Sequence, residues 1–490
     1  MKRRILSSLM ALVLCLTLLP AAAYAAGGTA VYVSSSGNDG TGDGSADKPF
    51  ATLAKAVDVA KDGATIYVMN DLTMTECAHF YSKSLTITSL GDATCTITRG
   101  DNFAQQQDNA RSTYNPAMVE VQTTSDVGAG LTLTNIIFDD GGKKEGTVFA
   151  QAVSDGSVGA TSNDNLVYVQ DAIIASNATV PTTITLGDGA VLRNFGGMSA
   201  VRVTEKAKLV MESGSKIEDT TVTDRVKGPS GSVGPAGAIW VQGASITMEK
   251  GSEISNIIGR AVYVDGGEVT VGGTISGITD NTDMWQSRNG CAIHLRGENA
   301  SAVLTSTAVV ENIFGSDSMN SSAIYVTGAD NHFLTEKGST IRKLTQTIGV
   351  NCVSNKNTKL NGEITEVSGA IPLRLDTADV VLGKDGIIHK NELASHGAAY
   401  VHNSSNLTIY GKINDNHSSS GLNAAALYIV VNGGDSHATL EPGGEICNNT
   451  NKGNKYGAAV ELQQGSCSFT MNGGTISGNS GPCGAVQVHK

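Results

Sequence analysis

The sequence has little of several residue types that mark large classes of protein. Aromatic residues make up 5% of the 490 positions, and there are only 9 prolines although glycine reaches 58. The glycines follow no three-residue period, which excludes collagen, and the scarcity of proline argues against Pro-rich disorder. Lysine and arginine number 34 against 46 aspartates and glutamates, a net charge of −12. Because nucleic-acid binding depends on a basic face, we expect no nucleic-acid partner.

The cysteines and histidines lack the spacing of a disulfide framework or a metal site. Beyond Cys15 the count of cysteines is odd, and no C-x-x-C pair occurs, so they are predicted to be small buried residues. A bridge from Cys447 or Cys467 stays open. The nine histidines show no H-x-x-x-H pair, which argues against zinc. The loop 39–47 resembles half of an EF-hand but has Phe50 in place of the closing glutamate. We therefore expect no cofactor and no resident metal.

No segment after the first 25 residues is long and apolar enough to span a membrane. The first 25 residues have a basic start at 2–4, an apolar run at 5–19 and a small-residue cleavage site at 23–25. This pattern is typical of a secretory signal peptide. We expect cleavage before Ala26 and a secreted, extracellular or cell-surface location in a bacterium.

From about residue 200 a triplet of short segments recurs, with a mean period of about 27 residues. A clear copy consists of Gly237–Val241, Ser245–Met248 and Ser252–Asn256. Each segment alternates apolar and polar residues with period two, which indicates a strand with one buried face. Three such strands cannot bury their apolar sides alone, but stacking one repeat on the next closes a core. The predicted fold is an all-β, right-handed three-sheet parallel β-helix.

Asparagine recurs after the third segment of the repeat. Asn tolerates the left-handed backbone that such a corner needs, and its amide can bond to the Asn one coil above. The sequence therefore predicts a structural role for these residues, which are Asn256, Asn312, Asn391, Asn448 and Asn479.

The N-terminal part predicts a strand at Ala30–Val33, a Gly-rich loop and a short helix. Phe50, Leu53, Ala54 and Val57 form one apolar stripe at helical spacing. We expect Asp47 to cap this helix, Pro49 to lie in its first turn and Gly63 to end it. A solenoid needs a cover over its apolar end, and this helix is well placed to supply one.

The same region resembles the secreted pectate-lyase-like β-helix superfamily. The matching residues are Tyr32-Val33-Ser34, Gly37, Asp39 and Pro49-Phe50-Ala51-Thr52. The resemblance implies a β-helix with an N-terminal capping helix. Members include polysaccharide lyases, glycoside hydrolases and non-enzymatic surface proteins, so the resemblance leaves function open.

The expected organisation has four parts. These are a signal peptide (1–25), an N-terminal strand, loop and capping helix (26–63), irregular coils with loop insertions (64–199) and regular coils (200–490). The stretches 102–115 and 140–165 are predicted to be loops that project from the stack. Because Gly484–Lys490 reads as the first strand of a further repeat, we expect the coils to continue beyond Lys490, followed by an anchoring region.

Candidate catalytic clusters are few. A lyase of this fold needs carboxylates that hold Ca²⁺ and a basic residue close by. Asp139 and Asp140 with Lys143 and Lys144 form the best local candidate, and a solvated turn is the alternative interpretation. A hydrolase needs several converging aspartates, and these cannot be assembled from the sequence.

The outward position of the first strand of each repeat is rich in rings. Read coil by coil it is Trp240, Tyr263, His294, Tyr325, Asn351, Pro372, Tyr400, Tyr428, Glu461 and Gln487. Five of these ten are Trp or Tyr, although the whole chain has 2 Trp and 12 Tyr. Parallel stacking predicts a solvent-facing ladder of side chains about 4.8 Å apart. Such a ladder suits the faces of sugars, and like-on-like stacking that stabilises the sheet is the alternative.

Two functions follow from this sequence. The first is an adhesin-like or glycan-binding scaffold that has no catalytic site and binds an extracellular polysaccharide or a host glycan. Its expected binding residues are Trp240, Tyr263, His294, Tyr325, Tyr400 and Tyr428. The second is a polysaccharide lyase or glycoside hydrolase that acts on acidic plant or host polysaccharides, with Ca²⁺ in the lyase case.

Overall fold

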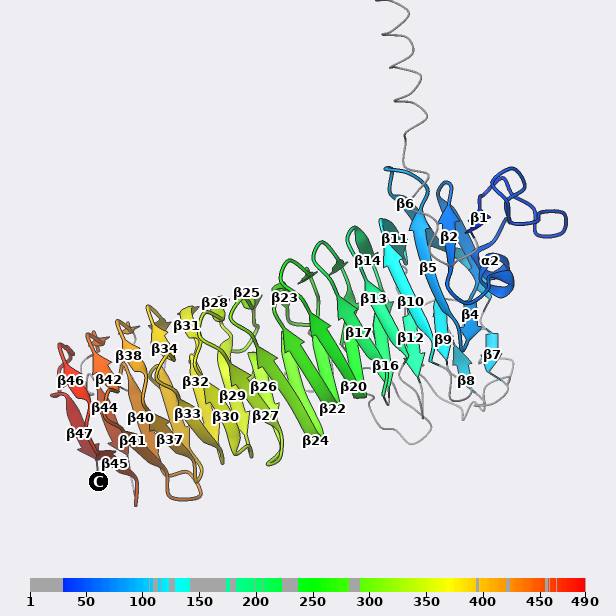
Figure 1. Cartoon of the computed structure of the whole chain (residues 1–490). Helices are drawn as coiled ribbons and strands as arrows, with labels where there is room; N and C mark the ends of the chain where they lie inside the picture. Colours follow the sequence, from blue (N-terminus) through cyan, green and yellow to red (C-terminus); the bar gives the residue numbers. More distant parts are fainter. Residues whose placement is uncertain are drawn as a thin grey trace, which may run out of the picture.

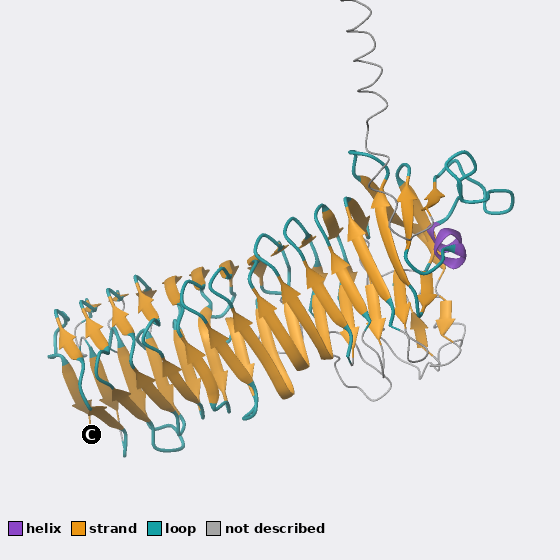
Figure 2. Cartoon of the chain, in the orientation of Figure 1, coloured by secondary structure: helices purple, strands orange, loops and turns teal. Residues whose placement is uncertain are grey.

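The described residues form one long stack of β-coils with a single short helix at the N-terminal end of the stack (Figures 1 and 2). The computed structural model describes residues 30–489 except 105, 109–112, 116, 123–127, 142–172, 177–181, 198, 205, 223–236, 282–290, 394–395, 420–423, 454–456, 458 and 464. Apart from one hairpin and one isolated bridge, the strand pairs of the described residues are parallel and join each strand to its counterpart one coil away. The parallel β-helix predicted from the repeat is therefore confirmed.

The first strands of successive coils pair to form the ladder that we call the first-strand ladder. Its strands are β4 (Ala78–Tyr81), β9 (Val119–Gln122), β12 (Ile173–Ser176), β16 (Val201–Thr204), β20 (Ile239–Met248), β22 (Val262–Val271), β24 (Ile293–Leu304), β26 (Ser322–Thr327), β29 (Ile348–Val353), β32 (Leu373–Asp376), β36 (Ala399–His402), β40 (Leu427–Val430), β44 (Val460–Gln463) and β47 (Val486–His489).

The second strands of the coils form the second-strand ladder, to which β20, β22 and β24 also belong because they run on around the corner. Its other strands are β1 (Ala30–Val33), β2 (Ala64–Val68), β5 (Ser84–Ser89), β10 (Gly130–Thr134), β13 (Thr183–Leu186), β17 (Lys208–Met211), β27 (His332–Thr335), β30 (Asn357–Leu360), β33 (Asp379–Leu382), β37 (Asn406–Ile409), β41 (His437–Leu440) and β45 (Ser468–Met471).

The third strands form a separate third-strand ladder. Its strands are β3 (Leu72–Glu76), β6 (Cys95–Ala104), β11 (Ile136–Asp139), β14 (Ala190–Arg193), β18 (Lys216–Glu218), β21 (Glu253–Ser255), β23 (Thr274–Thr279), β25 (Val309–Phe314), β28 (Thr340–Thr345), β31 (Glu363–Ser368), β34 (Ile387–His389), β38 (Lys412–Asn414), β42 (Glu445–Cys447) and β46 (Thr475–Ser477). Short strands extend some coils past this ladder: β15 (Gly196–Gly197), β19 (Thr221–Val222), β35 (Glu392–Leu393), β39 (His417–Ser418) and β43 (Thr450–Asn451).

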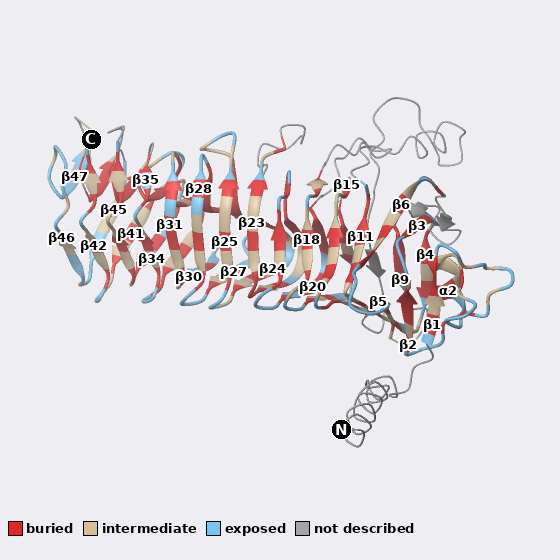
Figure 3. Cartoon of the chain, turned by 90° about the horizontal axis from the view of Figure 1, so that it is seen from above, coloured by how far each residue is buried: buried red, intermediate tan, exposed pale blue. Residues whose placement is uncertain are grey.

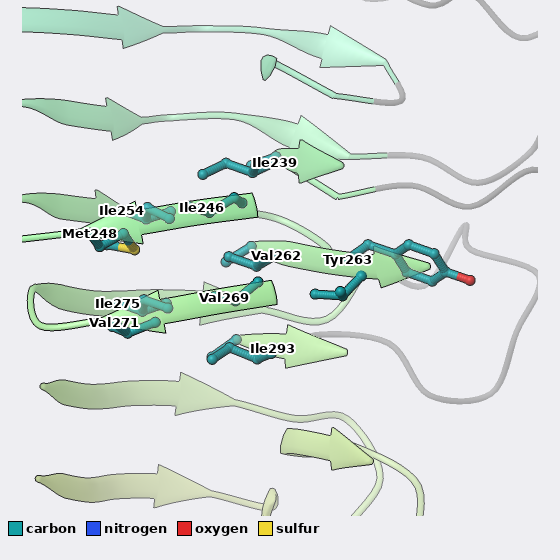
Figure 4. Close-up of a cluster of buried hydrophobic side chains, with 14 of the residues drawn as sticks. Ile239, Ile246, Met248, Ile254, Val262, Tyr263, Val269, Val271, Ile275 and Ile293 are labelled. Carbon is teal, nitrogen blue, oxygen red and sulfur yellow. The ribbon is translucent and has the colours of Figure 1, made fainter. Parts of the chain in front are cut away.

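Alternation along each strand sends one set of side chains into the stack. The buried bands run through successive coils as far as β44, as Figure 3 shows, whereas β45, β46 and β47 contain no buried residue. Figure 4 shows the aliphatic side chains of three neighbouring coils together, among them Ile239, Val262 and Ile293, which pair in register. All three are fully buried. Tyr263 follows Val262 on β22 and points away from these three side chains, because successive strand residues face opposite sides of a sheet.

The asparagine corners divide into two structural positions, which the sequence had combined into one. Asn256, Asn312 and Asn448 have positive φ angles of 56°, 57° and 57°, the left-handed conformation that was predicted. Asn391 and Asn479 instead follow a left-handed residue, Lys390 or Gly478.

The position after the left-handed residue holds a buried amide ladder in the last coils. The Asn391 amide donates to Asn416 Oδ1 at 2.7 Å, Asn416 donates to Asn449 at 2.9 Å, and Asn449 donates to Asn479 at 2.9 Å. Backbone N–H groups of Asn416 and Asn449 donate to the next Oδ1 as well. These four residues form what we call the asparagine ladder, which supports the predicted bonding from coil to coil.

The helix α2 (Leu53–Val59) packs against β1 and β4 at the N-terminal end of the stack. Leu53, Ala56 and Val57 are buried, whereas Ala54 of the predicted stripe is partly exposed. The predicted cap was wrong, because the helix begins after Thr52, whose hydroxyl accepts from the Lys55 amide at 3.1 Å.

Two polar side chains hold the ends of this helix. The Asp39 carboxylate accepts from the amides of Ala51 and Thr52, so the loop that resembles an EF-hand serves the entry to the helix. At the other end the Lys83 ammonium donates to the carbonyls of Val57 and Ala60 at 2.7 and 2.8 Å. Cations stabilise the C-terminal end of a helix because its last carbonyls carry partial negative charge.

Some of the predicted features lie wholly or partly outside the described residues. Within the predicted loop 102–115, β7 (Gln106–Asp108) and β8 (Thr113–Asn115) form an antiparallel hairpin. The signal peptide, and 142–165 of the second predicted loop, lie outside the described residues. Cys77, Cys95, Cys291 and Cys352 are buried, and the cysteines of the described part form no disulfide. No helix among the described residues is long and apolar enough to cross a membrane.

Candidate functional site

Two columns of side chains stand on the outside of the first-strand ladder, at alternate positions of each strand. We call the surface that they form the outer face. From β16 onward the ring column is Arg202, Trp240, Tyr263, His294, Tyr325, Asn351, Arg374, Tyr400, Tyr428, Glu461 and Gln487. Two residues further along each strand, the polar column is Thr204, Gln242, Asp265, Arg296, Thr327, Val353, Asp376, His402, Val430, Gln463 and His489.

The structure brings all six predicted ring residues into one column, but it buries them. Their exposed fractions are 8% for Trp240, 4% for Tyr263, 2% for His294, 4% for Tyr325, and 5% each for Tyr400 and Tyr428. The expectation of a solvent-facing ladder was therefore wrong. Parallel pairing brings neighbouring rings into contact, which removes part of their surface from water.

Measured ring contacts support this explanation. The centroids of Tyr263 and His294 are 5.0 Å apart, those of His294 and Tyr325 4.8 Å, and those of Tyr400 and Tyr428 5.4 Å with an interplanar angle of 12°. Tyr400 and Tyr428 thus stack face to face, whereas the rings of Tyr263 and Tyr325 meet His294 at interplanar angles of 43° and 62°.

One member of the predicted column was wrong. Leu373 pairs with Val350 on one side and Ala399 on the other, so it takes the inward position. Arg374, and not Pro372, therefore stands between Asn351 and Tyr400. The error arose because the motif GAIPL was aligned with GAIWV, whereas the strand is shifted by two residues, which preserves the inside–outside alternation.

Arg374 is the centre of a polar group that the sequence did not reveal. Its Nη1 donates to the Met319 carbonyl at 3.0 Å, and its Nε lies 3.3 Å from Nε2 of His402. Its Nη2 lies 3.6 Å from the Asp376 carboxylate. Two sequence signals existed, namely the alternation Leu373-Arg374-Leu375-Asp376 and the position of His402 two residues after Tyr400.

Two histidines flank Tyr400. His402 stacks on its ring at 4.3 Å and 15°, and His396 lies 4.6 Å from it. Burial lowers the pKa of His402 to about 4; the Arg374 charge adds to this shift, and Asp376 offsets part of it. Burial, with a contribution from Arg374, also lowers the pKa of His396. Both imidazoles are therefore neutral at pH 7.

This part of the outer face contains buried polar atoms without a partner. Nδ1 of His396 and Oδ1 of Asn351 make no hydrogen bond. His396 also has a positive φ of 62°, which is uncommon for a residue with a side chain. Buried polar groups are normally paired, so such atoms are candidates for contact with water or a ligand.

Glu461 is a buried carboxyl group two coils beyond Tyr400. Glu461 is fully buried, and His489 Nε2 lies 3.4 Å from Glu461 Oε1. Burial raises the pKa of Glu461 to about 7, and the backbone amide of Ala424 offsets only part of that shift. A carboxylic acid with such a pKa can give or take a proton near neutral pH.

The candidate lyase cluster lies elsewhere, on the third-strand ladder. Asp139 accepts from Arg193 Nε at 2.7 Å and from the Asn194 amide at 2.9 Å. Burial would raise the pKa of Asp139, but these two partners and the Gly141 amide hold it below its ordinary value. Asp140 is fully buried and pairs with Arg99.

Both carboxylates are thus already matched by arginines. Lys143 and Lys144 of the same cluster lie outside the described residues. Among the residues that the structure describes, no three His, Cys, Asp or Glu side chains come together as a metal site.

Neither a family model nor a curated protein sequence matches this chain. Solved structures that resemble it include a GH136 lacto-N-biosidase from Eubacterium ramulus, with 13% identity over 77% of this chain and 67% of that protein, at a TM-score of 0.43. A rhamnogalacturonan lyase is 11% identical over 69% and 82%, with a TM-score of 0.30. A pectate lyase is 12% identical over 90% and 78%, with a TM-score of 0.23. All three TM-scores are below 0.5, and the parallel β-helix architecture of this chain follows from its own strand pairing.

Proposed function

We propose that this protein is carbohydrate-active and binds a glycan on its outer face. The observation that carries the proposal is the layering of this face: a column rich in packed rings stands beside a column in which planar polar side chains recur, among them Gln242, Asp376 and Gln463. Asp376 and Gln463 of the polar column are partly exposed, and Asn432 bonds to Tyr400 Oη at 3.4 Å beside them. Amide, carboxylate and guanidinium groups match the paired hydroxyls of a sugar, because they offer two acceptors or two donors in one plane.

The burial of the rings assigns them a supporting part in this proposal. Tyr400 and Tyr428 are packed with Ile348, Ile371 and Val430 in a small apolar cluster outside the main core. A rigid layer of this kind limits the freedom of the polar side chains that stand beside it, which lowers the entropic cost of binding. The glycan would contact the polar column and the edges of Trp240, Tyr263, His294, Tyr325, Tyr400 and Tyr428.

The test is a binding measurement on variants of the polar column. We expect Asp376→Ala with Gln463→Ala to weaken binding to a glycan selected from an array by about tenfold or more, which corresponds to about 1.4 kcal/mol. Thr408→Ala is the matched control, because Thr408 is an outward residue of the second-strand ladder. If the double variant binds as the wild type does, or the control loses as much affinity, the outer face is not the binding surface.

Cleavage of the bound glycan is a second candidate function. It is favoured by Glu461, whose raised pKa is the property of a general acid. Asp376 lies three coils away in register, which is about 14 Å. Paired carboxylates of glycosidases lie about 5–9.5 Å apart, so Asp376 does not complete a hydrolytic pair with Glu461.

Loss of product formation in Glu461→Gln, with glycan binding retained, would establish the enzyme. If the wild type forms no new reducing ends and no unsaturated sugars from the glycans that it binds, the enzymatic candidate is excluded. Within the described residues, anchoring to a cell surface, which an adhesin requires, has no observation in its favour. Export through the N-terminal signal peptide and an extracellular location belong to the same proposal.

A further inference from the structure

The outer face is electrically balanced over the described coils. From β16 to β47 its two columns contain the arginines 202, 296 and 374 and the carboxylates Asp265, Asp376 and Glu461. The charges alternate along the stack. Asp265 and Arg296 face each other in the pairing of β22 with β24, and Arg374 and Asp376 lie on one strand.

Each of the three arginines is engaged within the protein. The Arg374 guanidinium is shared by the Met319 carbonyl, His402 and the Asp376 carboxylate. The Arg202 guanidinium lies over the Trp240 ring, 5.4 Å from its centroid. Arg296 stands opposite Asp265 and hydrogen-bonds to Tyr263.

The two histidines beside Tyr400 add no positive charge to the outer face near pH 7. His396 and His402 are neutral, because burial lowers the pKa of each. Glu461 loses its proton as the pH rises through about 7, so its contribution is zero or negative. The chain as a whole has a net charge of −12. A glycan that carries carboxylates would therefore approach a protein of its own sign and, among the described residues of the two columns, meet arginines that already contact other groups of the protein.

We propose that the outer face binds an uncharged glycan and discriminates against glycans made of uronic acids. This inference rests on the proposed function and names its ligand class. The physical reason is desolvation: an anionic sugar must lose water to bind, and it recovers that cost only from an unpaired cation or a bridging metal. Uncharged hydroxyl groups need only the donors and acceptors that the polar column already presents.

The first experiment uses matched ligands. Oligogalacturonate and its carboxyl-reduced product have the same linkage and differ in one group per sugar. A panel would include this pair, the equivalent pair made from oligoglucuronate, and neutral xylo-, galacto- and N-acetylhexosamine oligosaccharides, each titrated by calorimetry at pH 7. We expect at least one uncharged member to bind about tenfold or more tightly than any uronate, with little change between low and high salt.

The possible outcomes separate this inference from the function on which it rests. Tighter binding of the uronates, weakened by salt, would overturn the inference and leave glycan binding intact. Failure of every member of the panel to bind would overturn both.

A second experiment changes the charge balance itself. Asp376→Asn removes the carboxylate beside Arg374 and keeps the size of the side chain. We expect the ratio of uronate affinity to uncharged-ligand affinity to rise by about threefold or more, whatever the variant does to binding as a whole. Asp379→Asn removes an equal charge from the second-strand ladder, where Asp379 accepts from Asn406 at 2.6 Å, and is the matched control. An equal rise in both variants, or none in Asp376→Asn, would contradict the proposal.

Discussion

At the scale of single residues, burial sets the chemistry of the outer face. His402 and Glu461 are both almost inaccessible, and burial shifts their pKa values in opposite directions because it disfavours the charged form of each. The histidine becomes a neutral hydrogen-bonding group, and the carboxyl group stays protonated up to near neutral pH. Both residues lie next to the packed rings, since His402 stacks on Tyr400 and Glu461 pairs with Tyr428.

Glu461 makes the stability of the protein depend on pH. Its pKa is raised from 4.5 to about 7, so the folded state holds a proton that the unfolded chain releases. The stabilisation is complete below pH 4.5 and is lost as the pH rises through 7. Because the buried His402 acts on both proteins alike, we compare them: the stability at pH 8 relative to pH 5 should be lower in the wild type than in Glu461→Gln, by at most about 3 kcal/mol.

Thermal unfolding followed by circular dichroism at the two pH values measures this difference. Glu445→Gln is the control, because Glu445 forms a partly exposed pair with Lys412 at 3.0 Å. A Glu461→Gln protein with the pH dependence of the wild type would exclude this source of the effect.

At the scale of elements, the strand and corner patterns differ in how far the sequence could predict them. Period-two alternation identified the strands, because an inward residue such as Val262 or Ile293 must be apolar. The register of each strand was harder to predict. A shift of two residues keeps the alternation intact, so nothing in the pattern distinguished Pro372 from Arg374. The asparagine corners were predicted correctly as a group. The sequence could not separate the left-handed position from the next one, which forms the asparagine ladder, because asparagine occurs at both.

The asparagine ladder gives a prediction at this scale. Asn416 lies between Asn391 and Asn449. Its side-chain oxygen accepts from the Asn391 amide, and its own amide donates to Asn449 Oδ1. We expect Asn416→Ala to lower the free energy of unfolding by about 1–3 kcal/mol, because it removes the acceptor of the buried Asn391 amide and one of the two donors to Asn449 Oδ1. Asn406→Ala removes an exposed amide that bonds to Asp379, and we expect it to cost less than about 0.5 kcal/mol. Urea denaturation of the two variants compares the costs, and equal costs would contradict a special role for the ladder.

At the scale of the whole molecule, the solenoid makes stability a local property, since each coil contacts only its neighbours. The repeat predicted this architecture from the sequence alone. The candidate site could be predicted only in part, because its polar column and its charges depend on which coil lies beside which. The burial of the rings also depends on that arrangement, and the sequence shows only that they point outward.

A defect in one coil should therefore stay near that coil. Val350 is fully buried in β29, in the middle of the stack. We expect Val350→Asp to remove hydrogen-exchange protection from the coils that include β26, β29 and β32, while the N-terminal and C-terminal coils keep theirs. Val353→Asp, on the outward side of the same strand, is the control and should leave protection almost unchanged. Loss of protection throughout the chain in Val350→Asp would show that the coils unfold as one unit.

The two-residue shift at Arg374 also has an evolutionary consequence, which concerns parity. When a coil gains or loses an even number of residues before its strand, its apolar side chains still face the core. Only the identity of the outward side chain that stands beside those of the neighbouring coils changes. An odd change would send charged residues into the core. Insertions or deletions of two residues can therefore change the ligand-contacting side chain of one coil at a time. The fold and the neighbouring coils stay as they are.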